Sequence, residues 1–126
     1  MATAQVIAFD QSIKFMESVG IENIMKHEAA LVEYGQELLQ KNNSVKLIGS
    51  PKNKGGVLSF NIEGIHPHDV ATILDEDVVA IRAGHHCCQI LHDKLNIHAS
   101  ARASDGIDNN KDELDKLNDS INNWKK

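Results

Sequence analysis

The chain has 126 residues, of which 41% are hydrophobic and 25% charged, and its formal net charge is −5. This length suits one domain, residues 1–126, which buries roughly two thirds of the surface that its unfolded form exposes. The basic residues form no stripe and no apolar run approaches the roughly 20 residues of a membrane span, so neither nucleic acid nor membrane is an expected partner.

Two amphipathic helices are predicted at the beginning of the chain. Apolar residues recur at helical spacing and stop at Gly20: Val6, Phe9, Ile13 and Met16. A second stripe runs to Lys41, before Asn42-Asn43, and comprises Ile21, Ile24, Met25, Leu31, Leu38 and Leu39.

Two strands follow these helices. Val45, Leu47 and Ile48 mark a short one, and the turn-rich segment 49–56 separates it from Val57 to Ile62. In that second segment apolar and polar side chains alternate, which is the period of a half-buried strand.

Helices and strands then alternate to the end of the chain. Pro67 begins a helix to about Leu74, since proline suits the first helical turn. Three further elements are expected: a buried strand Val78 to Ile81, a short helix Cys87 to Leu95 after the Gly84 turn, and a weak strand Ala99 to Ser104.

The last helix opens with a predicted capping box formed by Asn110 and Glu113. Its apolar stripe comprises Leu114, Leu117, Ile121 and Trp124. The whole order predicts an α+β domain in which helices pack on a small, mostly antiparallel sheet.

The segment from Arg82 to Ile90 concentrates the reactive side chains, because it contains both cysteines and two of the seven histidines. A thiol attacks as the thiolate, and a glycine turn leading into a helix supplies N–H dipoles that stabilise negative charge at Cys87. His85 and His86 can raise the local positive potential or relay protons, or one of them can simply hydrogen-bond the turn. The alternative is a structural role for Cys87, since free cysteines are often buried.

An ordered set of motifs gives this turn a family resemblance. Arg-Ala-Gly-His-His-Cys, with Gly64-Ile65-His66-Pro67-His68-Asp69 before it and Ala101-Arg102-Ala103-Ser104 after it, resembles the C-terminal domain of Suf-type cysteine desulfurases. These are class-V aminotransferase relatives of fold type I that depend on pyridoxal phosphate (PLP), and selenocysteine lyases are closely similar. The opening helices and the segment 55–61 resemble that domain too.

The resemblance implies roles for three residues. Cys87 would attack the sulfur of PLP-bound L-cysteine, carry a persulfide and leave alanine, which requires an exposed, partly ionised thiol. Arg102 would hold the substrate carboxylate through its planar fork of donors, although an ordinary surface arginine is the alternative. Arg82 would order the cysteine loop or contact substrate.

Partners and supporting residues are also implied by the resemblance. His68 resembles a residue that contacts a sulfur-acceptor protein of the Suf system, with packing beside Pro67 as the alternative. Cys88 stands where the family tolerates several residues, so we expect it to be dispensable. The parent enzyme is expected to be a cytoplasmic homodimer that serves iron–sulfur cluster assembly, and the adjacent cysteines suit a reduced compartment.

The family's Schiff-base lysine has no counterpart here, since no segment resembles its serine-glycine-histidine-lysine motif. The resemblance therefore implies a fragment without its own PLP, and we expect no desulfurase activity from it alone. Acidic side chains at Asp10, Asp105 and Asp108 replace the small or apolar residues usual in the family, which suggests a surface redesigned for an isolated domain.

Two other classes of function compete with this interpretation. A metal-binding module is conceivable because donors occur at His85, His86, Cys87, Cys88 and His92, but adjacent ligands cannot all point at one metal. We therefore expect no metal site. The other class is a sulfur-carrier or interaction domain that uses Cys87 without PLP.

Overall fold

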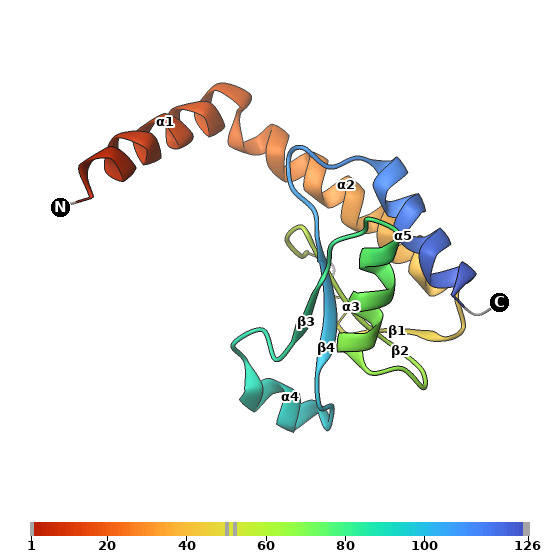
Figure 1. Ribbon diagram of the computed structural model, residues 1–126. Coiled ribbons are helices and arrows are strands. Elements are labelled where there is room, and N and C mark those ends of the chain that lie inside the picture. Colours follow the sequence, from red (N-terminus) through yellow and green to blue (C-terminus); the bar gives the residue numbers. More distant parts are fainter. Residues whose placement is uncertain (1, 50, 52, 125–126) are drawn as a thin grey trace.

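The computed structural model describes residues 2–49, 51 and 53–124. Within these residues it confirms the α+β fold, in which five helices accompany a four-stranded sheet. The strand order is β1 (Val45–Leu47), β2 (Val57–Ile62), β4 (Ser100–Ser104) and β3 (Arg82–Gly84), and all strand pairs are antiparallel. Helices α2 (Ile21–Gln40) and α3 (Pro67–Glu76) pack on this sheet, and α5 (Lys111–Asn123) packs on these two helices. Helix α1 (Thr3–Val19) extends away from the sheet (Figure 1).

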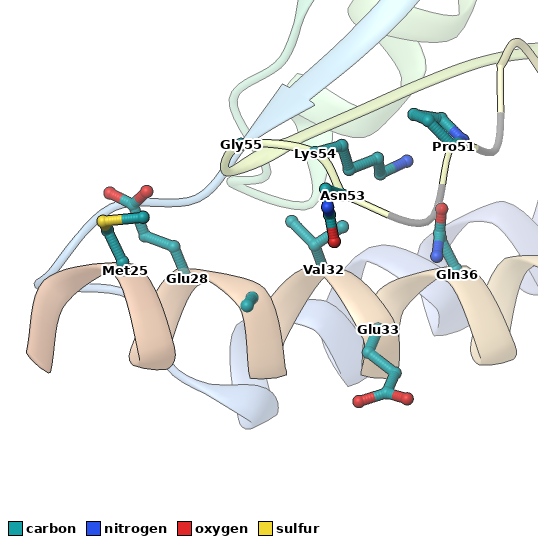
Figure 2. A pocket seen from close by; sticks show the side chains of 10 residues that line it. Met25, Glu28, Val32, Glu33, Gln36, Pro51, Asn53, Lys54 and Gly55 are labelled. Carbon is teal, nitrogen blue, oxygen red and sulfur yellow. The ribbon is translucent and has the colours of Figure 1, made fainter. Parts of the chain in front are cut away.

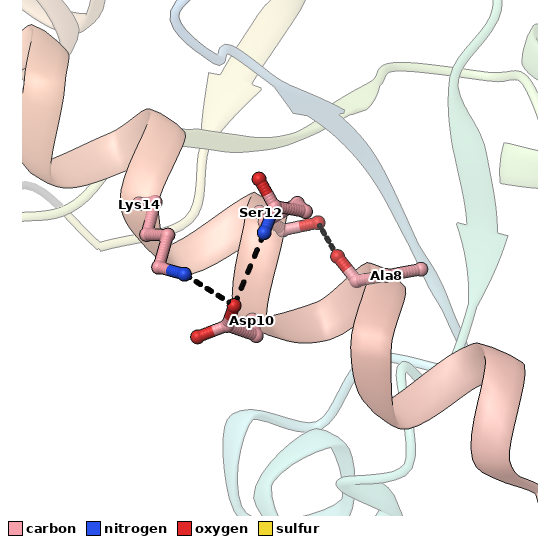
Figure 3. A network of polar contacts seen from close by, with 5 residues as sticks. Ala8, Asp10, Ser12 and Lys14 are labelled. Carbon is pink, nitrogen blue, oxygen red and sulfur yellow. Dashed lines mark hydrogen bonds and ion pairs between the residues drawn. The ribbon is translucent and has the colours of Figure 1, made fainter.

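The two predicted helices at the start are α1 (Thr3–Val19) and α2 (Ile21–Gln40). Gly20 separates them with a φ of 91°, a conformation that glycine adopts without strain. No residue of α1 is buried, and its polar side carries an ion pair of 2.7 Å between Lys14 and Asp10 (Figure 3). The predicted stripe of α2 is only partly correct, because Ile21 and Met25 are exposed.

The sheet places one face of each strand in the core. β1 (Val45–Leu47), β2 (Val57–Ile62) and β4 (Ser100–Ser104) fulfil the sequence prediction. Leu58 pairs with Ala103 and Phe60 with Ala101, and all four side chains are buried. Two residues of the segment 49–56, Ser50 and Lys52, lie outside the described residues.

The predicted strand Val78 to Ile81 is wrong, because the third strand is β3 (Arg82–Gly84). α3 (Pro67–Glu76) ends just before this segment, and the backbone N–H groups of Val78 and Val79 donate to carbonyls of that helix at 2.9 Å. These donors are therefore used to close the helix and cannot form a ladder. Val78 itself has a φ of 60° and is 82% exposed.

The predicted helix after the glycine turn is real but starts later. α4 (Gln89–Leu95) begins two residues beyond Cys87, since both His86 and Cys87 have positive φ, at 52° and 61°. A residue in the left-handed region cannot join an α-helix, so Cys87 belongs to the loop.

The last helix, α5 (Lys111–Asn123), has the predicted capping box of Asn110 and Glu113. Three of its four predicted apolar residues are buried, but Trp124 lies just beyond the helix and is largely exposed. Among the described residues, no helix combines the length and the apolar composition that crossing a bilayer requires.

Candidate functional site

Cys87 lies on the loop between β3 and α4, at one end of the sheet (Figure 1). Its side chain is exposed, whereas that of the neighbouring Cys88 is half-buried. The two consecutive positive φ angles turn the chain sharply at this point. Cys87 is therefore accessible to a reagent or a partner, and the alternative of a buried structural cysteine is wrong for this residue.

Two arginines lie side by side on the strands that support this loop. Arg82 of β3 is the register partner of Arg102 of β4, so both side chains leave the sheet on the same face. This face is opposite the one that buries Ala101 and Ala103. The Nε atom of Arg102 is buried and has no hydrogen-bond partner among the described residues.

His86 connects the arginines to the cysteine loop. Its Nε2 lies 3.0 Å from the carbonyl oxygen of Ser100, and because a carbonyl can only accept, Nε2 carries the proton. Burial lowers the pKa of His86, and the positive charges of Arg102 and Arg82 lower it further, whereas the hydrogen bond to Ser100 raises it. The neutral ring is thus favoured, and its Nδ1 is a buried acceptor without a partner among the described residues.

A second imidazole lies below the loop. His92 of α4 is only 3% exposed, and its Nε2 lies 3.0 Å from the hydroxyl of Ser100. The Nδ1 atom of His92 lies 3.1 Å from the backbone carbonyl oxygen of Cys88 and 3.7 Å from the Sγ atom of the same residue. From the sequence, His92 was considered only as a metal ligand, and Ser100 was missed. The i,i+4 spacing of Cys88 and His92 could have indicated that these two side chains share a helix face, but no local pattern indicates Ser100.

The remaining predicted residues are less central. His85 is exposed, and its ring meets that of His92 edge-on at 5.5 Å. His68 is exposed in the first turn of α3, where its ring stacks on that of His66 at 5.3 Å. The contacts of His68 are thus local, in keeping with either of the two roles that the sequence left open.

A cavity of about 540 Å³ adjoins the cysteines, lined by Cys87, Cys88, Gln89, Ile90, Leu91 and Lys94. A PLP site of this kind requires a lysine together with groups that stack on the ring and pair with its nitrogen. The lining offers a lysine but neither an aromatic ring nor a carboxylate. The residues at Cys87 therefore do not fit the whole cofactor, while the arginine pair fits a carboxylate.

The metal-module alternative finds no support in the geometry. Across residues 2–49, 51 and 53–124, no three His, Cys, Asp or Glu side chains come together in an arrangement that would hold a metal ion.

Another cavity, of about 680 Å³, lies between α2 and the segment after β1, far along the chain from the cysteines (Figure 2). Its lining includes Gln36 and Lys54 but neither Cys87 nor the two arginines. Burial lowers the pKa of Lys54, and Asp105 opposes that shift. We therefore place the candidate site at the cysteine loop and not at this cavity.

Comparison with known proteins gives consistent matches. The profile of the aminotransferase class-V family matches residues 1–117. A cysteine desulfurase of Haloferax volcanii is 44% identical over 119 residues, which cover 94% of this chain and 28% of that protein. A probable cysteine desulfurase of Halalkalibacterium halodurans is 43% identical over 114 residues, covering 90% of this chain and 28% of the relative.

Solved structures agree with these sequence matches. The apo structure of a cysteine desulfurase from Thermococcus onnurineus NA1 superposes with a TM-score of 0.84 at 36% identity, over 89% of this chain and 28% of that one. A cysteine desulfurase of Escherichia coli has the same fold, with a TM-score of 0.90 at 24% identity over 98% of this chain and 30% of that one. The chain thus spans less than a third of the length of these relatives.

Proposed function

Because the chain belongs to the aminotransferase class-V family, we propose that it is the small, C-terminal domain of a Suf-type cysteine desulfurase. In that enzyme Cys87 would take the sulfur of L-cysteine as a persulfide and leave alanine. The sulfur would pass to an acceptor protein for iron–sulfur cluster assembly. The level of identity to cysteine desulfurases supports this proposal.

The arrangement around Cys87 is the observation that carries the proposal. An exposed thiol adjoins a neutral imidazole, and that imidazole lies in the field of two paired arginines. Arg102 would hold the substrate carboxylate, because a guanidinium binds a carboxylate with two parallel hydrogen bonds. Arg82 would add positive charge beside it and help to fix the loop.

His86 would act on protons at the same place. Nδ1 is the unprotonated nitrogen of this ring, because the Ser100 carbonyl holds Nε2 in the protonated form, so Nδ1 is the atom that would take a proton. His85 would add a further exposed imidazole at the loop, and His68 would contact the acceptor protein from α3.

PLP would be supplied by the larger part of the parent enzyme, a homodimer, and would make the substrate sulfur open to attack by withdrawing electrons. On this proposal the 126-residue chain alone releases no alanine from L-cysteine and added PLP. Alanine release by the purified chain, followed by amino-acid analysis, would contradict this division of labour.

Sulfur transfer tests the role of Cys87. The chain is treated with inorganic polysulfide, the thiols are trapped with iodoacetamide, and the added sulfur is located by tandem mass spectrometry. We expect the sulfur on Cys87 and its loss from the Cys87→Ser variant. A Cys87 that is unlabelled from the earliest time point onwards would refute the proposal.

Carboxylate binding tests Arg102. We expect L-alanine, the product, to shift NMR signals of the arginine-bearing strands, whereas L-alaninamide, which lacks the carboxylate, should not. Arg102→Lys keeps the charge but loses the planar fork, so it should weaken the L-alanine effect by about tenfold. Equal shifts by the acid and the amide would remove the carboxylate role.

A further inference from the structure

The cluster formed by Cys88, His92 and Ser100 is not used in the function proposed above. Cys88 precedes the first residue of α4 and His92 lies one turn into that helix, so their side chains share a face. Ser100 reaches the same imidazole from the start of β4. A thiol, a buried imidazole and a hydroxyl are therefore arranged in a row that begins at the residue next to Cys87.

The contacts of His92 allow it to exchange a proton with Cys88. The hydroxyl of Ser100 can donate to Nε2 or accept from it, so this contact is compatible with either neutral form of the ring. In one form Nδ1–H donates to the carbonyl of Cys88 at 3.1 Å. In the other, Nδ1 is bare and lies 3.7 Å from the Sγ of Cys88, within reach of the thiol proton.

At rest the thiol of Cys88 donates to the carbonyl oxygen of His85 at 2.9 Å. This hydrogen bond keeps the sulfur beneath the loop that carries Cys87. Because adjacent residues have Cα atoms about 3.8 Å apart, the two thiols belong to neighbouring backbone positions whose side chains can meet.

We propose that Cys88 is a second sulfur-carrying thiol, assisted by His92 and Ser100, that accepts the persulfide sulfur from Cys87. This inference rests on the proposed role of Cys87. It revises the expectation that Cys88 is dispensable: the residue would be dispensable for forming the persulfide but not for passing it on.

The transfer is balanced and neutral in redox terms. Nδ1 of His92 takes the proton of Cys88, whose thiolate attacks the outer sulfur of the Cys87 persulfide. The S–S bond to Cys88 forms while the S–S bond to Cys87 breaks, and Cys87 leaves as a thiolate that recovers the proton. The products are a Cys88 persulfide and a free Cys87 thiol.

Geometry favours the outer sulfur over the inner one. Attack on the inner sulfur would release sulfide and join the two cysteines, but their Cα spacing of about 3.8 Å is shorter than the usual range for a disulfide. Attack on the outer sulfur instead holds the two Sγ atoms about two S–S bond lengths apart, in line. The sulfur is therefore moved and not lost.

The imidazole is tested first, without any sulfur donor. In the Cys87→Ser variant of the full chain, the rate at which iodoacetamide alkylates Cys88 is measured across the pH range. Adding His92→Gln should slow it about tenfold at neutral pH and make it more dependent on pH, because the base is lost. The matched control His98→Gln, at an exposed histidine nearby, should change nothing. Equal rates with and without His92 would overturn the inference.

Because His92 is buried, Ser100→Ala provides a milder variant that keeps the ring in place. It should slow the alkylation of Cys88 in the same direction but less strongly. A rate unchanged by Ser100→Ala, in a chain whose circular dichroism matches the wild type, would remove Ser100 from the relay and overturn the inference as stated.

The transfer itself is tested with one equivalent of inorganic polysulfide, by locating the sulfur at increasing times. We expect sulfur on Cys87 first and on Cys88 later, about tenfold slower transfer in His92→Gln, and sulfur retained on Cys87 in Cys88→Ser. Sulfur that stays on Cys87 of the wild type would overturn this inference and leave the proposed function intact. Absence of sulfur from Cys87 would overturn the proposed function, and with it the transfer.

Discussion

Gly35 is a buried residue of α2 that faces Leu58 of the sheet, and replacing it by alanine has opposing effects that the structure resolves. Alanine favours the helix over glycine by about 1 kcal/mol. A methyl group at Gly35, however, would overlap the Cδ1 atom of Leu58 and lie 3.3 Å from the Cδ2 atom of Leu114. Overpacking of a filled core costs about 1–3 kcal/mol.

The burial of the neighbours decides which effect is larger. Leu58 is 0% exposed and Leu114 is 4% exposed, so neither side chain can move into solvent. The overpacking cost should therefore lie in the upper part of its range, about 2–3 kcal/mol, against a gain in helix propensity of about 1 kcal/mol. We expect Gly35→Ala to lower the free energy of unfolding by about 1–2 kcal/mol, measured by urea denaturation. A variant as stable as the wild type would refute the packing argument.

Two comparisons isolate the cause. In a Leu58→Val background the clashing atom is absent, so Gly35→Ala should become neutral or stabilising, with a coupling energy of about 1–3 kcal/mol in the double-mutant cycle. Gly55 is the matched control, since no described atom beyond its chain neighbours lies within 4 Å of its Cβ position. Gly55→Ala should leave stability unchanged or raise it by about 0.4–1 kcal/mol.

Three further predictions concern charge and capping. Burial raises the pKa of Asp105, and the negative charges of Glu113 and Glu28 raise it further. The contribution of Asp105 to stability is therefore present in acid and is lost as the pH rises through its folded-state pKa. Asp105→Asn should stabilise the chain at neutral pH and do so less in mild acid, as measured by urea titrations at both pH values. Asn110→Ala removes the capping box and should destabilise the folded chain by about 1 kcal/mol, seen as a lower midpoint of thermal unfolding. An unchanged midpoint would show that the cap contributes nothing to stability. Burial lowers the pKa of His86, and the positive charge of Arg102 lowers it further. Arg102→Gln should therefore raise the pKa of His86, measured by NMR titration of the ring. An unchanged pKa would exclude this electrostatic interaction.

Helices and strands with a clear apolar pattern or a capping motif were predictable from the sequence. A segment whose conformation depends on how the preceding helix ends was not. Alternation along Val57 to Ile62 predicted β2, and the pair Asn110 and Glu113 predicted the start of α5. The apolar run at Val78 looked like a strand, but the hydrogen bonds that close α3 use its donors. The use of these N–H groups to close a helix leaves no periodic pattern of apolar residues in the sequence.

The site shows the same division. Cys87 and the two arginines were predicted as site residues from motifs. The pairing of Arg82 with Arg102 depends on strand register, which a strand as short as the three-residue β3 does not specify from its sequence. The relation of His92 to Ser100 joins a helix to a strand across a turn. It becomes visible only when the two elements are packed.

The exposure of α1 along its whole length has a consequence for how the chain unfolds. Most of the stability of a helix in a protein comes from packing of its apolar face, and α1 has no buried residue through which the core could hold it. Its opening free energy is therefore set by its own residues and is independent of the packing that stabilises the sheet. Helix content and the hydrogen exchange of the core amides are then expected to follow different transitions, so the molecule has two levels of cooperativity instead of one.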